Sequence, residues 1–177
     1  MIEYIRSQKL YSADFIRKVN SLEQYVLYKS EKDYSKKMYH LGYYYYYEKE
    51  LAKSIRTLQS ALTNKKKNNK DVYALMSRVY FDMNDFEKAQ DTAMKAHKLD
   101  SNNYLSLSVL GDLSYRNKDY KEALKYYKDA ESNNKTSSMY SVKVAQTYEK
   151  LGKEKKAVEI YERILRTYSD CYLAYYK

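Results

Sequence analysis

The chain has 177 residues, with no proline, no tryptophan, three glycines and 25 tyrosines. That length suits one ordinary domain or one stretch of a repeat array, and the absence of proline allows long helices joined by tight turns. The 33 Lys and Arg residues against 23 Asp and Glu give a net charge of +10. This charge permits nucleic acid, an anionic membrane or an acidic protein as partner, and requires none of them.

Cysteine usage and hydropathy exclude several other classes. Cys171 is the only cysteine, so an intrachain disulfide is excluded and a reducing compartment is favoured. The first residues lack the apolar core of a signal peptide, and the longest apolar runs are too short to span a bilayer. We therefore expect a cytoplasmic chain with no membrane segment.

The first predicted element is a helix over residues 11–29, with Ser12 placed as its N-cap. We expect residues 1–34 to form an N-terminal helical cap, or a degenerate repeat, that covers the apolar end of the structure. Large apolar residues recur along this helix at helical spacing, namely Phe15, Val19, Leu22 and Val26.

After this helix the sequence repeats itself. Ala89, Ala123 and Ala157 are 34 residues apart, and aligning the chain on them brings other columns into register. A fourth copy lies upstream after one extra residue, which the polar run at 65–70 can absorb as a solvated loop. Small residues recur where two helices must approach closely: Gly42, Ser77, Gly111 and Ala145 on the first helix, and Ser54, Ala89, Ala123 and Ala157 on the second.

The period predicts a pair of helices in each copy. Gly152 stands at the end of a first helix, where a residue able to adopt positive φ is favoured. Residues 172–177 resemble the start of a further helix, which suggests that the natural chain is longer. The predicted repeats are 35–69, 70–103, 104–137 and 138–171. The predicted first helices are 36–48, 70–82, 104–116 and 138–150, and the second helices are 51–63, 86–99, 120–133 and 154–167.

The third copy carries the clearest pattern, with Leu110-Gly111 on its first helix and Asp119 and Ala123 on its second. This pattern resembles the tetratricopeptide repeat, and the likeness covers roughly residues 35–170. The tryptophan and repeat-ending proline columns of that family are not kept here, and both are commonly variable. Pentatricopeptide repeats, which read RNA, have nearly the same period. They lack the Leu-Gly-x-x-Tyr pattern of the first helix, which all four copies here approximate, as in Leu41-Gly42 with Tyr45.

The resemblance implies an all-α, right-handed superhelical solenoid of antiparallel helix pairs. In that family peptides lie in a concave groove built mainly from the first helices, and tyrosine and arginine are residue types that dominate such interfaces. The run Tyr43–Tyr47 covers every face of a helix, so only some of its rings can line a groove. By register, the expected peptide-binding groove residues are Tyr39, Tyr43, Tyr46, Tyr47, Arg78, Phe81, Ser108, Asp112, Tyr115, Arg116 and Gln146.

One specialised function of the family is disfavoured. Members that grip the acidic C-terminal tails of heat-shock chaperones use lysine and asparagine on successive first helices. None of the matching residues here is a suitable donor: Tyr39, Tyr43, Leu75, Leu105 and Val109.

Catalytic residues are scarce in this sequence. His40 and His97 have no arrangement that pairs them with a nucleophile or with metal ligands. Three isolated glycines do not make a phosphate-binding loop. We therefore expect neither an enzyme nor a bound metal or cofactor.

The function that the sequence favours is a scaffold or adaptor that binds a segment of a partner protein, with acidic partners favoured by the net charge. Two alternatives remain. The basic surface and the tyrosines suit nucleic-acid binding by charge and stacking, and the open ends of a repeat array suit self-assembly.

Overall fold

A computed structural model describes residues 13–62, 69–135 and 137–175, without the side chains of Ala13 and 168–175. Nine helices and no strand are found in these ranges, so the expected all-α repeat solenoid is confirmed. Ser12, the lysine run at 65–67 and the side chain of Cys171 lie outside the described part. The helices are α2 (Ala13–Ser30), α3 (Tyr34–Tyr47), α4 (Leu51–Ala61), α5 (Lys70–Asp82), α6 (Phe86–Leu99), α7 (Tyr104–Arg116), α8 (Tyr120–Asn133), α9 (Ser138–Lys150) and α10 (Glu154–Tyr175).

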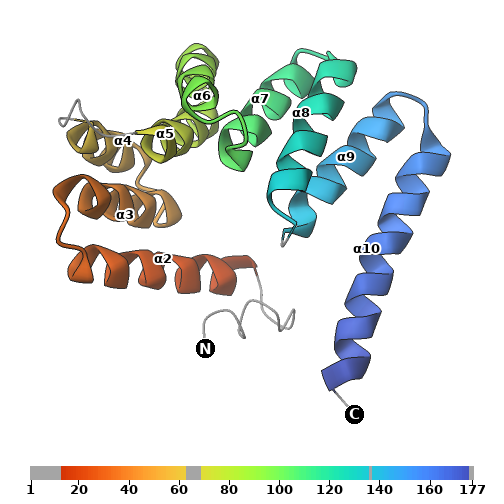
Figure 1. The fold of residues 1–177 in the computed structure, drawn as a ribbon, viewed down its shortest axis with the longest axis horizontal. Coiled ribbons are helices and arrows are strands. Elements are labelled where there is room, and N and C mark those ends of the chain that lie inside the picture. Colours follow the sequence, from red (N-terminus) through yellow and green to blue (C-terminus); the bar gives the residue numbers. More distant parts are fainter. Residues whose placement is uncertain (1–12, 63–68, 136, 176–177) are drawn as a thin grey trace.

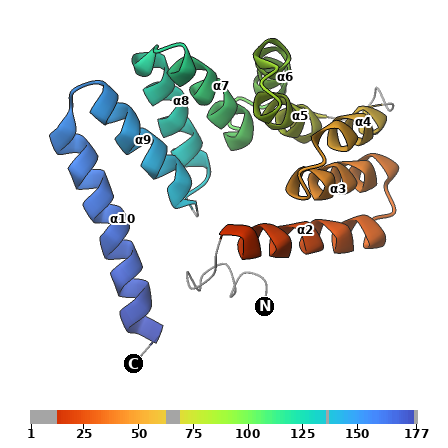
Figure 2. The same ribbon diagram turned by 180° about the vertical axis from the view of Figure 1, so that it is seen from behind.

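The helices follow one another along an arch that begins with α2 and ends with α10 (Figure 1). Within each repeat the two helices pack together, as α3 on α4, α5 on α6, α7 on α8 and α9 on α10. Successive repeats are joined because each second helix packs on the next first helix, and α3 also contacts α5, and α5 contacts α7. Seen from behind in Figure 2, α2 and α10 again stand at opposite ends of the arch.

The small-residue columns allow the paired helices to approach closely. A Cβ atom on Gly42 would lie 2.6 Å from side-chain atoms of Leu58, and one on Gly111 would lie 2.6 Å from the ring of Tyr127. Ala123 is fully buried at the matching position of the second helix. Real Cβ atoms do not come that close to other heavy atoms, so each glycine is needed for the partner side chain to occupy its place.

Every described repeat turns from its first helix to its second with the same backbone conformation. Lys49, Asn84, Lys118 and Gly152 all have φ between 62° and 69°. At each turn, the amide of the following residue donates to a carbonyl oxygen five residues back, as from Lys153 to Tyr148 at 2.9 Å. This is the hydrogen bonding of a Schellman C-cap. The sequence revealed the requirement only at Gly152, because asparagine and lysine fill the other turns.

The last helix departs from the prediction. The sequence places a helix end at residue 167 and a new helix from 172, whereas α10 runs without interruption from Glu154 to Tyr175. The segment 168–175 contains neither glycine nor proline, so no residue in it stops the helix that precedes it.

Replacing Gly152 by alanine should lower the free energy of unfolding by about 1 kcal/mol, because a Cβ disfavours positive φ. No heavy atom lies near the added methyl group, so the effect is conformational and not steric. Urea denaturation measures it. Lys118→Gly, which relieves the same strain at the equivalent turn, should not destabilise, and equal losses in both variants would contradict this explanation.

Gly111→Ala should lower the free energy of unfolding by about 1–3 kcal/mol, the usual cost of overpacking a close contact. The buried Tyr127 ring has little room to withdraw from the added methyl group. Chemical denaturation compares this variant with Ser114→Ala on the same helix, where we expect little change. An unchanged midpoint for Gly111→Ala would show that α7 and α8 can separate at small cost.

Candidate functional site

An open hollow of about 540 Å³ lies among the helices of three successive repeats. Its walls come from α5, the turn after α5, and α6, α7, α8 and α9. Charged, aromatic and amide side chains meet in it, so it offers both apolar area and polar groups. The lining residues are Arg78, Phe81, Asn84, Phe86, Asp112, Tyr115, Arg116, Tyr127, Lys143 and Gln146.

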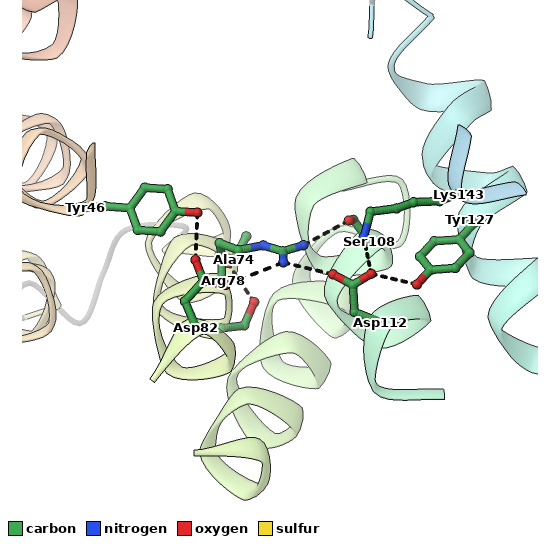
Figure 3. A network of polar contacts seen from close by, with 9 residues as sticks. Tyr46, Ala74, Arg78, Asp82, Ser108, Asp112, Tyr127 and Lys143 are labelled. Carbon is green, nitrogen blue, oxygen red and sulfur yellow. Dashed lines mark hydrogen bonds and ion pairs between the residues drawn. The ribbon is translucent and has the colours of Figure 1, made fainter. Parts of the chain in front are cut away.

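An ion pair between Arg78 of α5 and Asp112 of α7 lies in the wall of the hollow (Figure 3). The guanidinium Nη1 lies 2.8 Å from Asp112 Oδ2, and Nη2 donates to Ser108 Oγ at 3.0 Å. The two charged side chains are only 14% and 7% exposed. A desolvated, hydrogen-bonded pair of this kind fixes the geometry of both side chains.

Asp112 also accepts hydrogen bonds from the second helix of its own repeat and from the first helix of the next. Its Oδ1 atom accepts from the hydroxyl of Tyr127 on α8 at 2.6 Å and from the ammonium group of Lys143 on α9. In Figure 3 the Tyr127 hydroxyl reaches the carboxylate from the side away from Arg78, and the Lys143 side chain reaches it from above. One carboxylate is therefore shared by two cations, Arg78 and Lys143.

The network continues from Arg78 toward the first repeat. Asp82 Oδ1 lies 3.9 Å from Arg78 Nη1, and Asp82 Oδ2 accepts from the Tyr46 hydroxyl at 2.9 Å. Tyr46 belongs to α3, so polar contacts run without a break from α3 through α5 and α7 to α9 (Figure 3).

The charges set the protonation state of this network. Burial by itself would raise the pKa of the Asp112 carboxyl, but the positive charges of Arg78 and Lys143 outweigh burial and hold its pKa below the usual value. Burial, reinforced by the negative charge of Asp112, raises the pKa of Tyr127 far above the usual range. At neutral pH the carboxylate is therefore ionised and the phenol is a neutral donor.

Aromatic rings hold two of the cations. The guanidinium carbon of Arg116 lies 3.8 Å from the centroid of the Phe86 ring, and that of Arg78 lies 5.5 Å from Phe81. The two phenylalanine rings meet edge to face at 5.5 Å. Stacking on a ring restricts an arginine side chain while leaving the donors at the edge of its guanidinium plane accessible.

The tyrosines of α3 form a separate cluster. Tyr43 is stacked on Tyr47 at 5.2 Å and touches Tyr39 edge to face at 5.7 Å, and burial raises the pKa of Tyr43 well above its usual value. Tyr44 faces the other way, with its ring 5.4 Å from Tyr25 of α2. The run thus serves several faces of one helix, and much of its ring area is used in packing within the protein.

The structure gathers part of the predicted groove into one place. Arg78, Phe81, Asp112, Tyr115, Arg116 and Gln146 line the hollow, Ser108 is bonded to Arg78, and Tyr46 is linked to it through Asp82. The structure places Tyr39, Tyr43 and Tyr47 in the α3 cluster instead.

Sequence reasoning missed four lining residues: Asn84, Phe86, Tyr127 and Lys143. Tyr127 has the helical spacing of a core residue, and its ring is indeed buried while its hydroxyl reaches the hollow. Lys143 shares its column with Val109, Leu75 and His40, so no pattern marks it. Its role depends on the length of its side chain.

The described part of the chain contains no group of three or more His, Cys, Asp or Glu side chains able to hold a metal ion. None of its helices is both long and apolar enough to cross a membrane. His40 has a polar partner, with Nδ1 2.9 Å from Gln24 Oε1, and the ring of His97 meets Tyr126 edge to face at 6.5 Å.

Antiparallel helix pairs that stack only on their neighbours define the class of helical-repeat proteins. Within that class, residues 70–103 match the sequence model described as tetratricopeptide repeat. Residues 92–164 match the model of subunit 3 of the anaphase-promoting complex, or cyclosome, which is of the same repeat type. The chain is a tetratricopeptide-repeat protein, as the sequence pattern predicts. Such repeats support a role in protein interaction in general.

Solved structures show the same fold. A structure described as PilF of Pseudomonas aeruginosa aligns with a TM-score of 0.66 at 16% identity, covering 88% of this chain and 71% of that one. A structure of MamA aligns with a TM-score of 0.64 at 15% identity, covering 88% and 90%. At such identities the likeness concerns the fold alone. A comparison with curated protein sequences gives no significant match.

Asp112→Asn should lower the free energy of unfolding at neutral pH by roughly 3–5 kcal/mol, because it leaves the largely desolvated Arg78 and the half-buried Lys143 beside an uncharged partner. The folded-state pKa of Asp112 lies below the unfolded value of about 3.9. Its contribution is therefore complete above that unfolded value, and is lost as the pH falls through the folded-state pKa.

Urea denaturation between pH 7 and pH 3 should thus show a difference between native protein and variant that narrows at the acidic end. Asp129→Asn, at an exposed position of α8, serves as the control and should cost little at any pH. If Asp112→Asn lowered the free energy of unfolding at neutral pH as little as Asp129→Asn does, solvent and not the carboxylate would be stabilising the two cations.

Proposed function

We propose that this protein is a scaffold or adaptor that binds a segment of a partner protein in the hollow. The observation that carries the proposal is the convergence of predicted groove positions from three successive repeats on one concave surface. Phe81 comes from α5, Tyr115 from α7 and Gln146 from α9. A concave surface with aromatic walls and a few fixed polar groups is the usual form of a binding site.

The ion network explains how such a site would bind without a large entropic cost. Arg78 and Asp112 are already held by several partners, so they lose little freedom when a ligand arrives. Aromatic and arginine side chains in such a pocket contribute most of the binding energy of typical interfaces. The groups around the hollow thus supply a preorganised surface.

Self-association is a second candidate, favoured by the end helices. Leu22 and Val26 of α2 are each 63% exposed, and Val158 of α10 is 53% exposed. Apolar side chains on the terminal helices of an array can pack against another copy. Light scattering over a range of protein concentrations tests this, and a constant monomer mass would exclude it.

The proposal is tested by affinity capture from native extract, quantified by mass spectrometry. The double variant Arg116→Ala/Gln146→Ala changes two exposed residues of the hollow and should lose the specific partner while keeping its helical content. The matched control is Arg56→Ala/Gln59→Ala, which makes the same two changes at exposed positions of α4.

We expect the control to capture what the native protein captures. Equal capture by both double variants would place binding away from the hollow and contradict the proposal. Nuclease treatment of the extract separates the nucleic-acid alternative, since loss of the captured protein after digestion would mean that nucleic acid bridges the two.

A further inference from the structure

The charges around the hollow do not balance. Three cationic side chains line it, from Arg78, Arg116 and Lys143, and only one carboxylate, from Asp112. Asp112 is already shared between Arg78 and Lys143. Asp82, just outside the lining, lies 3.9 Å from Arg78, so within the described part of the chain one positive charge, that of Arg116, is left without a counter-ion. A concave site concentrates the resulting field.

Arg116 is the cation best placed to meet a ligand. Among the residues that the structure describes, it has neither a hydrogen bond nor an ion pair, and its one specific contact is the stacking on Phe86 at 3.8 Å. The guanidinium of Arg78, by contrast, already forms an ion pair with Asp112 and a hydrogen bond to Ser108. Arg116 is thus a fixed, exposed guanidinium with its donors accessible, the geometry that binds a carboxylate through two parallel hydrogen bonds.

The remaining wall completes a mixed surface. Gln146 of α9 is exposed and likewise has no polar partner in the described part of the chain, so its amide can donate to a ligand oxygen. Phe81 and Tyr115 add half-buried rings beside these donors. Donors and rings that line the same hollow suit an acidic side chain that is followed or preceded by an apolar one.

We propose that the hollow recognises an acidic residue of the partner segment, with its carboxylate bound by Arg116 and Gln146 and an adjoining apolar side chain packed on Phe81 and Tyr115. The proposal rests on the binding function proposed above and specifies the chemistry of the occupant. Charge complementarity selects a carboxylate, and the rings beside it select a polypeptide over a free anion.

The experiment is a selection of random peptides displayed on phage against the complete chain, followed by affinity measurements with synthetic copies. Selected peptides should be enriched in Asp or Glu next to an apolar residue. Arg116→Gln should weaken their binding about tenfold, the loss expected for a charge-assisted pair. The control Lys121→Gln removes the same charge from an exposed position of α8 outside the hollow and should leave the affinity unchanged.

Two further variants test the sign of the field without touching the buried network. Gln146→Glu adds a carboxylate to the hollow and should weaken binding of the acidic peptides, while Gln146→Lys should strengthen it. Versions of the peptides with Gln in place of Glu should respond to neither change. Circular dichroism confirms that each variant keeps its helices.

The outcomes separate the two proposals. Peptides without acidic enrichment, whose binding is lost in Arg116→Ala/Gln146→Ala, would overturn the acidic specificity and support binding in the hollow. Selected peptides that bind both double variants equally, or no selected peptide at all, would overturn both. Inorganic phosphate and a single-stranded oligonucleotide are titrated in parallel. Tighter binding of either one than of the peptides, lost in Arg116→Gln, would overturn the peptide as occupant.

Discussion

The close approach of paired helices is the constraint on which the rest of the structure depends. At Gly111 no side chain fits, because the ring of Tyr127 occupies the place of a Cβ atom. This contact lets α8 lie so near α7 that the Tyr127 hydroxyl reaches Asp112, the residue next to Gly111. A packing requirement between two helices therefore positions the donor that helps to hold the central carboxylate of the hollow.

Most of the fold could be predicted from periodicity. A spacing of 34 residues between small residues identifies the repeat, and apolar residues at helical spacing place the helices from Tyr34 to Lys150 close to where they lie. Positive φ was predictable only at Gly152, because the identical turn at Lys49 and Lys118 is imposed by the neighbouring helices and not by the residue. Tertiary packing overrides local preference at those turns.

The hollow was predictable only in part, for a different reason. Register along the first helices identifies Arg78, Asp112 and Gln146, since these positions recur at the repeat spacing. It does not identify Lys143, whose side chain extends from the fourth repeat to Asp112 in the third. Equivalent positions in the repeats show which face of a helix a residue occupies, and they do not show how far its side chain extends toward another helix. For the tyrosines of α3 the repeat register predicted positions in the groove, but it did not predict that Tyr39, Tyr43 and Tyr47 pack on one another.

The ion network also changes how the array holds together. Repeat proteins are commonly described as chains of units that interact only with their immediate neighbours. Here Arg78 of the second repeat and Lys143 of the fourth share the single carboxylate of Asp112 in the third. The two cations repel each other and the carboxylate between them offsets that repulsion, so the second and fourth repeats are thermodynamically coupled through the third. An energy function limited to interactions between adjacent repeats would miss the interaction between Arg78 and Lys143. The second, third and fourth repeats should therefore exchange between folded and unfolded states as one block.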